Sequence, residues 1–133
     1  METSSNESSV RTMVSFQVFS PNLLPEDVAR NLGEPDHLHR LGDYPHNDLR
    51  YSAYKHGMWS IDSKVPVGQP LEVHLDSLLS ILEPKQGYIK SLGRIATVDF
   101  YCDLFGQIGF QLSPQILKRI ADLGAALGVT VYP

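Results

Sequence analysis

Cysteine is nearly absent from the sequence, since Cys102 is the only one among 133 residues. A single cysteine excludes an internal disulfide and is typical of a reducing compartment. Apolar runs long enough for a membrane helix are also missing, and the opening METSSNESSV lacks the apolar core of a signal peptide. We therefore expect a cytoplasmic protein.

The sequence has no run of like charges either, and its formal net charge is −4. Binding to nucleic acid or to an anionic membrane requires clustered lysine and arginine side chains. The charge pattern thus argues against both partners, whereas it permits a basic protein partner. The hydrophobic fraction of 42% is ordinary for one soluble domain with its own core.

Three stretches have the signals of helices. The first runs from Pro25 to a stop at Gly33, and residues 71–83 carry a stripe of leucines at helical spacing. The third, residues 113–128, begins with Ser113 as its N-cap, followed by a proline, which is favoured at the first helical position.

Strand signals, which are alternation or β-branched and aromatic content, recur along the chain at 13–19, 49–54, 58–63, 94–102, 106–112 and 129–133. Short turns join the second to the third and the fourth to the fifth, which predicts two hairpins. The fold class is therefore α+β, a sandwich with a mostly antiparallel sheet of about six strands and helices packed on one face.

The chain divides into a short tail and one domain. Residues 1–12 lack periodicity and are expected to be a disordered N-terminal tail, whereas residues 13–133 form a single α+β domain. Residues 16–33 and 110–124 share a Phe-Gln, a Ser-Pro and a closing Leu-Gly. Either a ferredoxin-like βαβ duplication or the common way of starting a helix after a strand explains this echo.

The stretch GEPDHLHRLGDYPHND is the strongest metal candidate. His37 and His39 would share one side of a strand, and Asp36, Asp43 or His46 would complete a set of three or four ligands suited to zinc or iron. The alternative is a polar surface connection, because no motif of fixed spacing is present. We expect the connection, with no metal, and histidines that titrate near the usual value of about 6.5.

Aromatic side chains gather around the predicted first hairpin. Trp59 with Tyr44, Tyr51 and Tyr54 would line a groove for a ligand or for a partner's side chain. The alternative for Trp59 is an anchor in the core, since aromatic residues commonly stabilise sheets. The binding candidates are therefore Tyr44, Tyr51, Tyr54 and Trp59, although we also predict that Trp59 is largely buried.

No nucleophile stands out. The aromatic neighbours of Cys102 indicate an inert strand cysteine. Asp99 and Asp103 would be either an acid–base pair or charges on the solvated side of an edge strand, and we favour the second. His74 borders the leucine stripe and is expected to be half-buried. The sequence contains no GxSxG elbow and no glycine-rich phosphate loop.

Four stretches together resemble the bacterial domain-of-unknown-function family 4279: FSPNLLPEDVARNLGEPD, LGD at 41–43, HGMWSIDSK at 56–64 and LSPQILKRIADLGAALGVTVYP. The similarity covers nearly everything after residue 12. It implies a small α+β domain, and the family has no established activity. The histidines at 37 and 39 are not part of its pattern, which weakens a catalytic role for them.

The sequence therefore favours a non-catalytic binding or interaction protein that needs no cofactor. One version is an immunity-type protein, which neutralises a toxin by capping it. The alternative is a metal-dependent hydrolase-like enzyme that uses the His37, His39, Asp43 and His46 loop to activate water.

Overall fold

A computed structural model describes residues 10–133. The strands are β1 (Arg11–Ser20), β2 (His37–His39), β3 (Gly57–Asp62), β4 (Thr97–Phe105) and β5 (Ala126–Tyr132). The helices are α2 (Pro25–Leu32), α3 (Leu71–Leu82), α4 (Gln86–Leu92) and α5 (Pro114–Asp122), with short 3₁₀ turns at Pro45–Asn47 and Glu83–Lys85. Most of the predicted tail lies outside the described residues, and β1 begins two residues before the predicted strand.

The strands form one open five-stranded sheet in the order β2-β3-β1-β4-β5. β1 lies at its centre, antiparallel to both β3 and β4, and β2 is antiparallel to β3. β1 and β2 thus run parallel with β3 between them, and β3 and β4 run parallel with β1 between them. These two interleaved β-α-β units are the ferredoxin-like arrangement. The helix α5 then leads to β5, which is parallel to β4, so the sheet is mixed.

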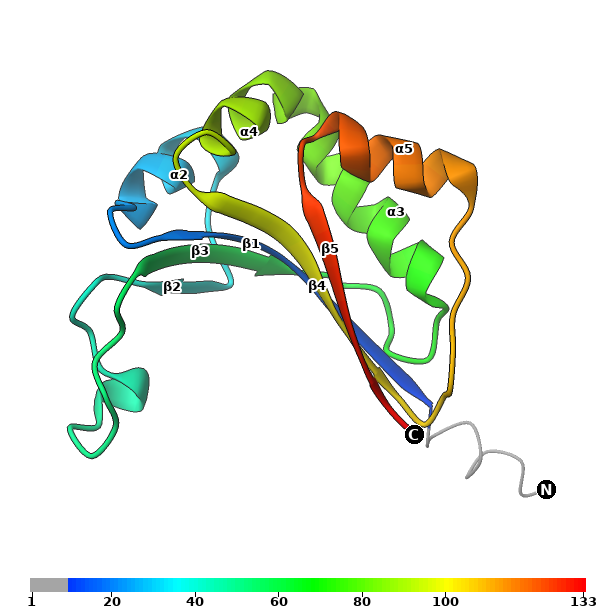
Figure 1. Cartoon of the computed structure of the whole chain (residues 1–133), viewed down its shortest axis with the longest axis horizontal. Coiled ribbons are helices and arrows are strands. Elements are labelled where there is room, and N and C mark those ends of the chain that lie inside the picture. Colours follow the sequence, from blue (N-terminus) through cyan, green and yellow to red (C-terminus); the bar gives the residue numbers. More distant parts are fainter. Residues whose placement is uncertain (1–9) are drawn as a thin grey trace.

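All the helices lie on one side of the sheet, as expected (Figure 1). Alternation in β1 turns Val14, Phe16 and Val18 toward them, and all three side chains are buried. The leucine stripe of α3 is buried against this side of the sheet as well. No described helix is long and apolar enough to cross a membrane.

The prediction that Trp59 is buried is confirmed, because its side chain is 0% exposed. The indole packs edge-on against Phe16, with ring centroids 6.4 Å apart. Its Nε1 donates a hydrogen bond to the carbonyl oxygen of Gly33, 3.1 Å away. Trp59 therefore joins β3 to the end of α2 from inside the core.

The start of α5 is confirmed and its predicted end is wrong. The Ser113 hydroxyl accepts a hydrogen bond from the backbone N–H of Ile116 at 3.3 Å, which is an N-cap. The helix stops at Asp122, and Gly124 has the left-handed φ of +72° that commonly follows a helix end. Residues 126–128 consequently belong to β5, which is longer than the predicted last strand.

Both predicted hairpins are wrong, and the sheet has one strand fewer than expected. Residues 49–54 form no strand, and β3 pairs instead with the short β2. Residues 106–112 form an irregular connection in which Ile108 is 90% exposed, because β4 already has β1 and β5 as neighbours. The sequence echo is therefore not a structural repeat, since Phe110 lies in this connection whereas Phe16 lies in a strand.

Candidate functional site

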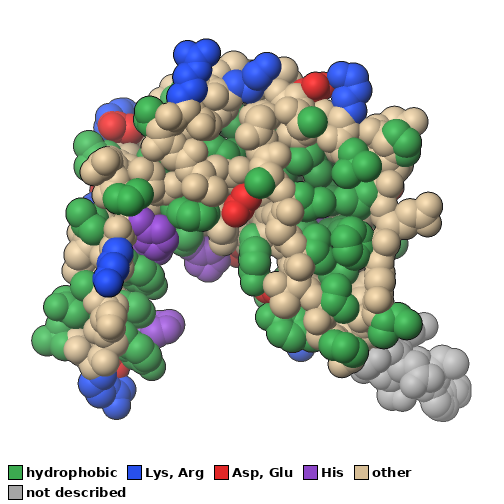
Figure 2. Space-filling model, in the orientation of Figure 1, with side chains coloured by type: hydrophobic (Ala, Val, Ile, Leu, Met, Phe, Trp, Pro, Cys, Tyr) green, Lys and Arg blue, Asp and Glu red, His purple; other side chains and the backbone are tan. Residues whose placement is uncertain are grey.

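The side of the sheet opposite the helices, which we call the open face, is hollowed (Figure 2). Strand alternation and register place on it polar side chains in the middle and larger ones toward the ends. These residues are His37, His39, Met58, Ser60, Asp62, Met13, Ser15, Gln17, Phe19, Thr97, Asp99, Tyr101 and Asp103. The open face is the candidate functional site, because no described helix covers it.

One wall of the hollow is the side loop, residues 40–56, which joins β2 to β3. Tyr54 holds it by backbone bonds, accepting from the N–H of Gly42 at 2.9 Å and donating to the carbonyl of Asp43 at 2.8 Å. The Asp43 carboxylate accepts from the backbone N–H of Arg40 at 2.8 Å, as expected of turn chemistry. The side loop is thus built on the edge of the sheet, and Figure 2 shows histidine side chains at the top of this wall and on its side toward the hollow.

A chain of hydrogen bonds crosses the open face near β2. The Ser15 hydroxyl donates to Asp62 at 2.7 Å, and the other oxygen of Asp62 lies 2.9 Å from Nε2 of His37. His37 remains largely exposed and Asp62 orients its ring. Such a pair can exchange protons with a bound group, but the chain places its serine on the aspartate rather than on the histidine, so it activates no nucleophile.

His39 differs from the prediction for the loop histidines. Burial, with the nearby imidazole of His56 as a second cause, lowers the pKa of His39. Its Nε2 lies 3.4 Å from Nδ1 of His56. The expectation of titration near 6.5 is therefore wrong for His39, because β2 is a strand that turns this ring under the side loop.

A cleft of about 650 Å³ between β2 and the side loop is lined by the predicted metal ligands His37, His39, Asp43 and His46. Within residues 10–133, however, no three histidine, cysteine, aspartate or glutamate side chains converge closely enough to hold a metal ion. The cleft can therefore offer hydrogen bonds and imidazole rings to a ligand, while a ligand set for a metal is not assembled there.

The structure divides the predicted aromatic group. Tyr44 and Tyr54 line the 650 Å³ cleft, and Tyr51 is exposed on the side loop with its ring 6.0 Å from that of His46. Trp59 lies on the opposite side of the sheet, in the core. Tyr44, Tyr51 and Tyr54 therefore remain candidates for binding, whereas Trp59 has a structural position.

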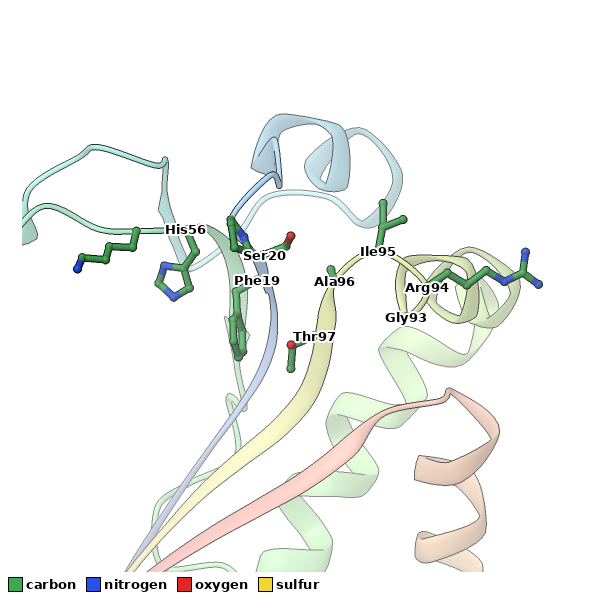
Figure 3. A pocket seen from close by; sticks show the side chains of 10 residues that line it. Phe19, Ser20, His56, Gly93, Arg94, Ile95, Ala96 and Thr97 are labelled. Atoms are coloured by element: carbon green, nitrogen blue, oxygen red, sulfur yellow. The ribbon is translucent and has the colours of Figure 1, made fainter.

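A second cleft, of about 520 Å³, lies at the end of the open face where β1 ends and β4 begins. Figure 3 shows Phe19 and His56 side by side at this cleft, with Arg94 pointing away from it. The rings of Phe19 and His56 meet edge-on, with their centroids 5.4 Å apart. Thr97 and the largely exposed Ile95 complete a mainly apolar wall, so this cleft fits an apolar group.

Asp99 and Asp103 lie on the open face of β4, which is an inner strand and not the predicted edge strand. One oxygen of each carboxylate is buried and has no hydrogen-bond partner among the described residues. Burial also raises the pKa of Asp99. Between them, Tyr101 leans over Gly128, where an added Cβ would lie 3.7 Å from the tyrosine ring. The aspartates thus form an acidic floor beside an aromatic ring.

Two further predictions concern buried groups. Cys102 is inert as predicted, since burial raises the pKa of its thiol to about 12. The prediction that His74 is half-buried is wrong, because only 1% of it is exposed and its Nδ1 lies 2.7 Å from the Ser63 hydroxyl. The buried leucines before and after His74 on α3 face the sheet, and His74 lies among them on the same side of the helix.

Sequence reasoning missed two residues of the site, His56 and Asp62. His56 directly precedes β3 and Asp62 ends it, and the side chains that they contact belong to β1 and β2. Only the strand register brings them together, although alternation along residues 56–62 does place both on the same side as Met58 and Ser60.

Comparisons with known proteins give one result about family membership. No curated protein and no solved structure matches the chain. A family model described as a domain of unknown function, DUF4279, matches residues 9–133. This match covers the entire sheet with its helices and the side loop. The chain belongs to the DUF4279 family of domains of unknown function.

Proposed function

We propose that the protein is a non-catalytic binding protein that covers a protein partner with its open face. The observation that carries this proposal is the one-sided sheet, whose helices fill one face while the other is hollowed between the side loop and β4. A concave sheet with a wall on one side can receive a loop or helix of another protein.

Exposed apolar and aromatic side chains on both sides of the hollow support a protein as the ligand. Leu41, Leu49 and Tyr51 are exposed on the side loop, and Met13 and Tyr101 are exposed at the other side. Tyrosine and methionine are enriched in protein interfaces, where tyrosine is a frequent hot spot. A partner that filled the hollow would bury both groups together.

The charge of the hollow favours a basic contact segment. Asp62, Asp99 and Asp103 all lie on the open face, and Asp99 and Asp103 each have a buried oxygen with no hydrogen-bond partner within residues 10–133. A lysine or arginine side chain from the partner would supply the missing hydrogen bonds. The formal net charge of −4 would also steer a basic partner toward the protein.

One concrete form of this proposal is a bacterial immunity-type protein that acts in the cytoplasm by capping a toxin. Its support is an analogy with other small binding domains. The free Cys102, which is buried, is compatible with a reducing compartment.

The test uses a photo-crosslinking amino acid at position 51 of the side loop, in the cells from which the sequence comes. The matched control carries the same group at position 117, an exposed leucine on α5. We expect position 51 and not position 117 to crosslink to one protein. The crosslinked protein is then purified, and the wild-type chain should bind it at least about tenfold more tightly than the Asp99→Asn, Asp103→Asn variant does. Equal crosslinking at both positions, or unchanged affinity, would contradict the proposal.

The alternative, a metal-dependent hydrolase-like enzyme, rests on the 650 Å³ cleft that His37, His39, Asp43 and His46 share. A metal held there would activate a water molecule, so no side-chain nucleophile would be needed. Metal titration, described in the Discussion, separates this function from the binding protein.

A further inference from the structure

The strand β5 forms one edge of the sheet, and among residues 10–133 it pairs only with β4. Its seven residues, Ala-Leu-Gly-Val-Thr-Val-Tyr, include no charged side chain and no proline. Charges, prolines, bulges and short length are the means by which proteins prevent edge strands from pairing with other chains. The edge at β5 has none of these protections.

The opposite edge of the sheet is different. The strand β2 has three residues, two of which are histidines. His37 is engaged with Asp62, and the side loop follows directly after His39. A short edge with polar side chains and a covering loop does not readily pair with another strand. Any pairing between sheets is therefore expected at β5.

An apolar row accompanies the β5 edge. Leu127, Val129 and Val131 lie beside Phe100, Cys102 and Leu104 of β4, on the helix side of the sheet. The β4 residues are 0% exposed, whereas those of β5 are only partly buried. Figure 2 shows hydrophobic side chains gathered beside this strand. Uncovered apolar surface next to an unpaired edge is typical of an interface.

We propose that two copies of the chain pair through β5, antiparallel, about a twofold axis at Val129, and so join their sheets into one. With Val129 on the axis, Leu127 of each copy lies opposite Val131 of the other. These apolar pairs are on the helix side, so the pairing would extend the core of each copy across the edge. Every outward-facing backbone group in the paired stretch would gain a partner.

The side chains of β5 on the open face indicate that the strand pairing with β5 comes from a second copy of the chain. In this register Gly128 lies opposite Thr130, and Ala126 lies opposite Tyr132, so a small residue faces a larger one at each position. Such self-complementarity is what a twofold interface requires. Since β5 carries no charge, two chains that each have a net charge of −4 meet at uncharged edges.

The proposal is independent of the proposed function and is tested on the purified full chain. Sedimentation equilibrium over a wide concentration range should show the wild type as a dimer. Val129→Glu and Val129→Lys each place two like charges at the axis, so each should weaken the dimer by on the order of a hundredfold. Mixing the two variants places opposite charges there and should restore a dimer. Leu49→Glu, on the side loop and away from β5, is the matched control and should remain dimeric.

Circular dichroism accompanies each variant to establish that it folds. If the Val129 variants are unfolded, Thr130→Lys replaces them, because its side chain lies on the open face, and it should also be monomeric. A wild type that stays monomeric at the highest concentration overturns the proposal. So does a folded Val129→Glu or Thr130→Lys variant that dimerises as tightly as the wild type.

Discussion

His39 and Tyr54 stack face to face, with ring centroids 3.5 Å apart and ring planes within 2° of parallel. One ring belongs to β2 and the other to the side loop, so the contact fixes the wall of the hollow against the edge of the sheet. The orientation of the side loop therefore depends on a pair of rings as well as on two backbone hydrogen bonds.

The first prediction concerns this stack. Tyr54→Ala should lower the free energy of unfolding by about 1 kcal/mol and speed hydrogen exchange in residues 40–56, because the loop loses its aromatic contact. Tyr54→Phe keeps the ring and is the matched control, with exchange close to that of the wild type. Hydrogen exchange followed by mass spectrometry measures both. Equal protection of the loop in the alanine variant would show that the stack does not hold it.

The second prediction concerns the core. Trp59→Ala should lower the free energy of unfolding by about 3–5 kcal/mol, the usual effect of emptying a buried aromatic site. Trp59→Phe should lower the free energy of unfolding by less, because the phenyl ring retains most of the contact with Phe16. Its remaining effect comes from the lost hydrogen bond to the Gly33 carbonyl. Urea unfolding followed by circular dichroism gives both values. An alanine variant as stable as the wild type would be incompatible with a buried indole.

The third prediction concerns pH and His74. Burial lowers the pKa of His74, so the folded protein binds a proton less readily than the unfolded chain. The contribution of His74 to the free energy of unfolding is fully present above the pKa of the unfolded chain, about 6.5. It is lost as the pH falls from there toward the lower pKa of the folded protein. Burial lowers the pKa of His39 as well, so this residue adds to the same slope.

Urea unfolding between about pH 8 and about pH 5 measures this slope. His74→Asn removes the titrating ring and should flatten the dependence, leaving the part due to His39. Ser63→Ala is the control, since it removes the hydrogen bond to His74 but leaves the ring buried. It should be less stable at every pH and keep the slope. An asparagine variant with the slope of the wild type would exclude His74 as its source.

The fourth prediction concerns metal binding. We expect calorimetry with zinc, nickel and manganese to show no binding at micromolar concentration, because Asp62 holds His37 and Tyr54 and His56 enclose His39. A closed site needs about four ligands held by surrounding hydrogen bonds. Tight binding that disappears in the His37→Ala, His39→Ala variant would favour the hydrolase instead.

Local signals were sufficient for some elements and misleading for others. The leucines of α3, the cap of α5 and the alternation of β1 predicted those elements because each pattern reflects contact with one core. Residues 49–54 alternate equally well, but the stretch lies in the side loop, and Tyr51 and Leu49 are exposed there. The strand β2 is three residues long, and its existence depends on β3 rather than on its own sequence.

The site was less predictable than the fold, for a related reason. The sequence pointed to His37, His39, Tyr44 and Tyr54, which are near one another in the chain and do line one cleft. The acidic floor depends on register instead. Asp99 lies beside Gln17, and Asp62 lies beside Ser15, only because β1 is inserted between β3 and β4. Pairs of this kind are set by topology and leave no local signal.

The central position of β1 has a consequence for how the chain folds. Its two neighbours are β3, which ends at Asp62, and β4, which ends at Phe105, so β1 has no strand to pair with before residue 57 and only β3 before residue 97. Sheets that depend on such distant pairings fold slowly, and their apolar strands stay exposed meanwhile. A ribosome-bound chain that stops before residue 97 would therefore display β1 with one side unpaired, as a ready target for chaperones.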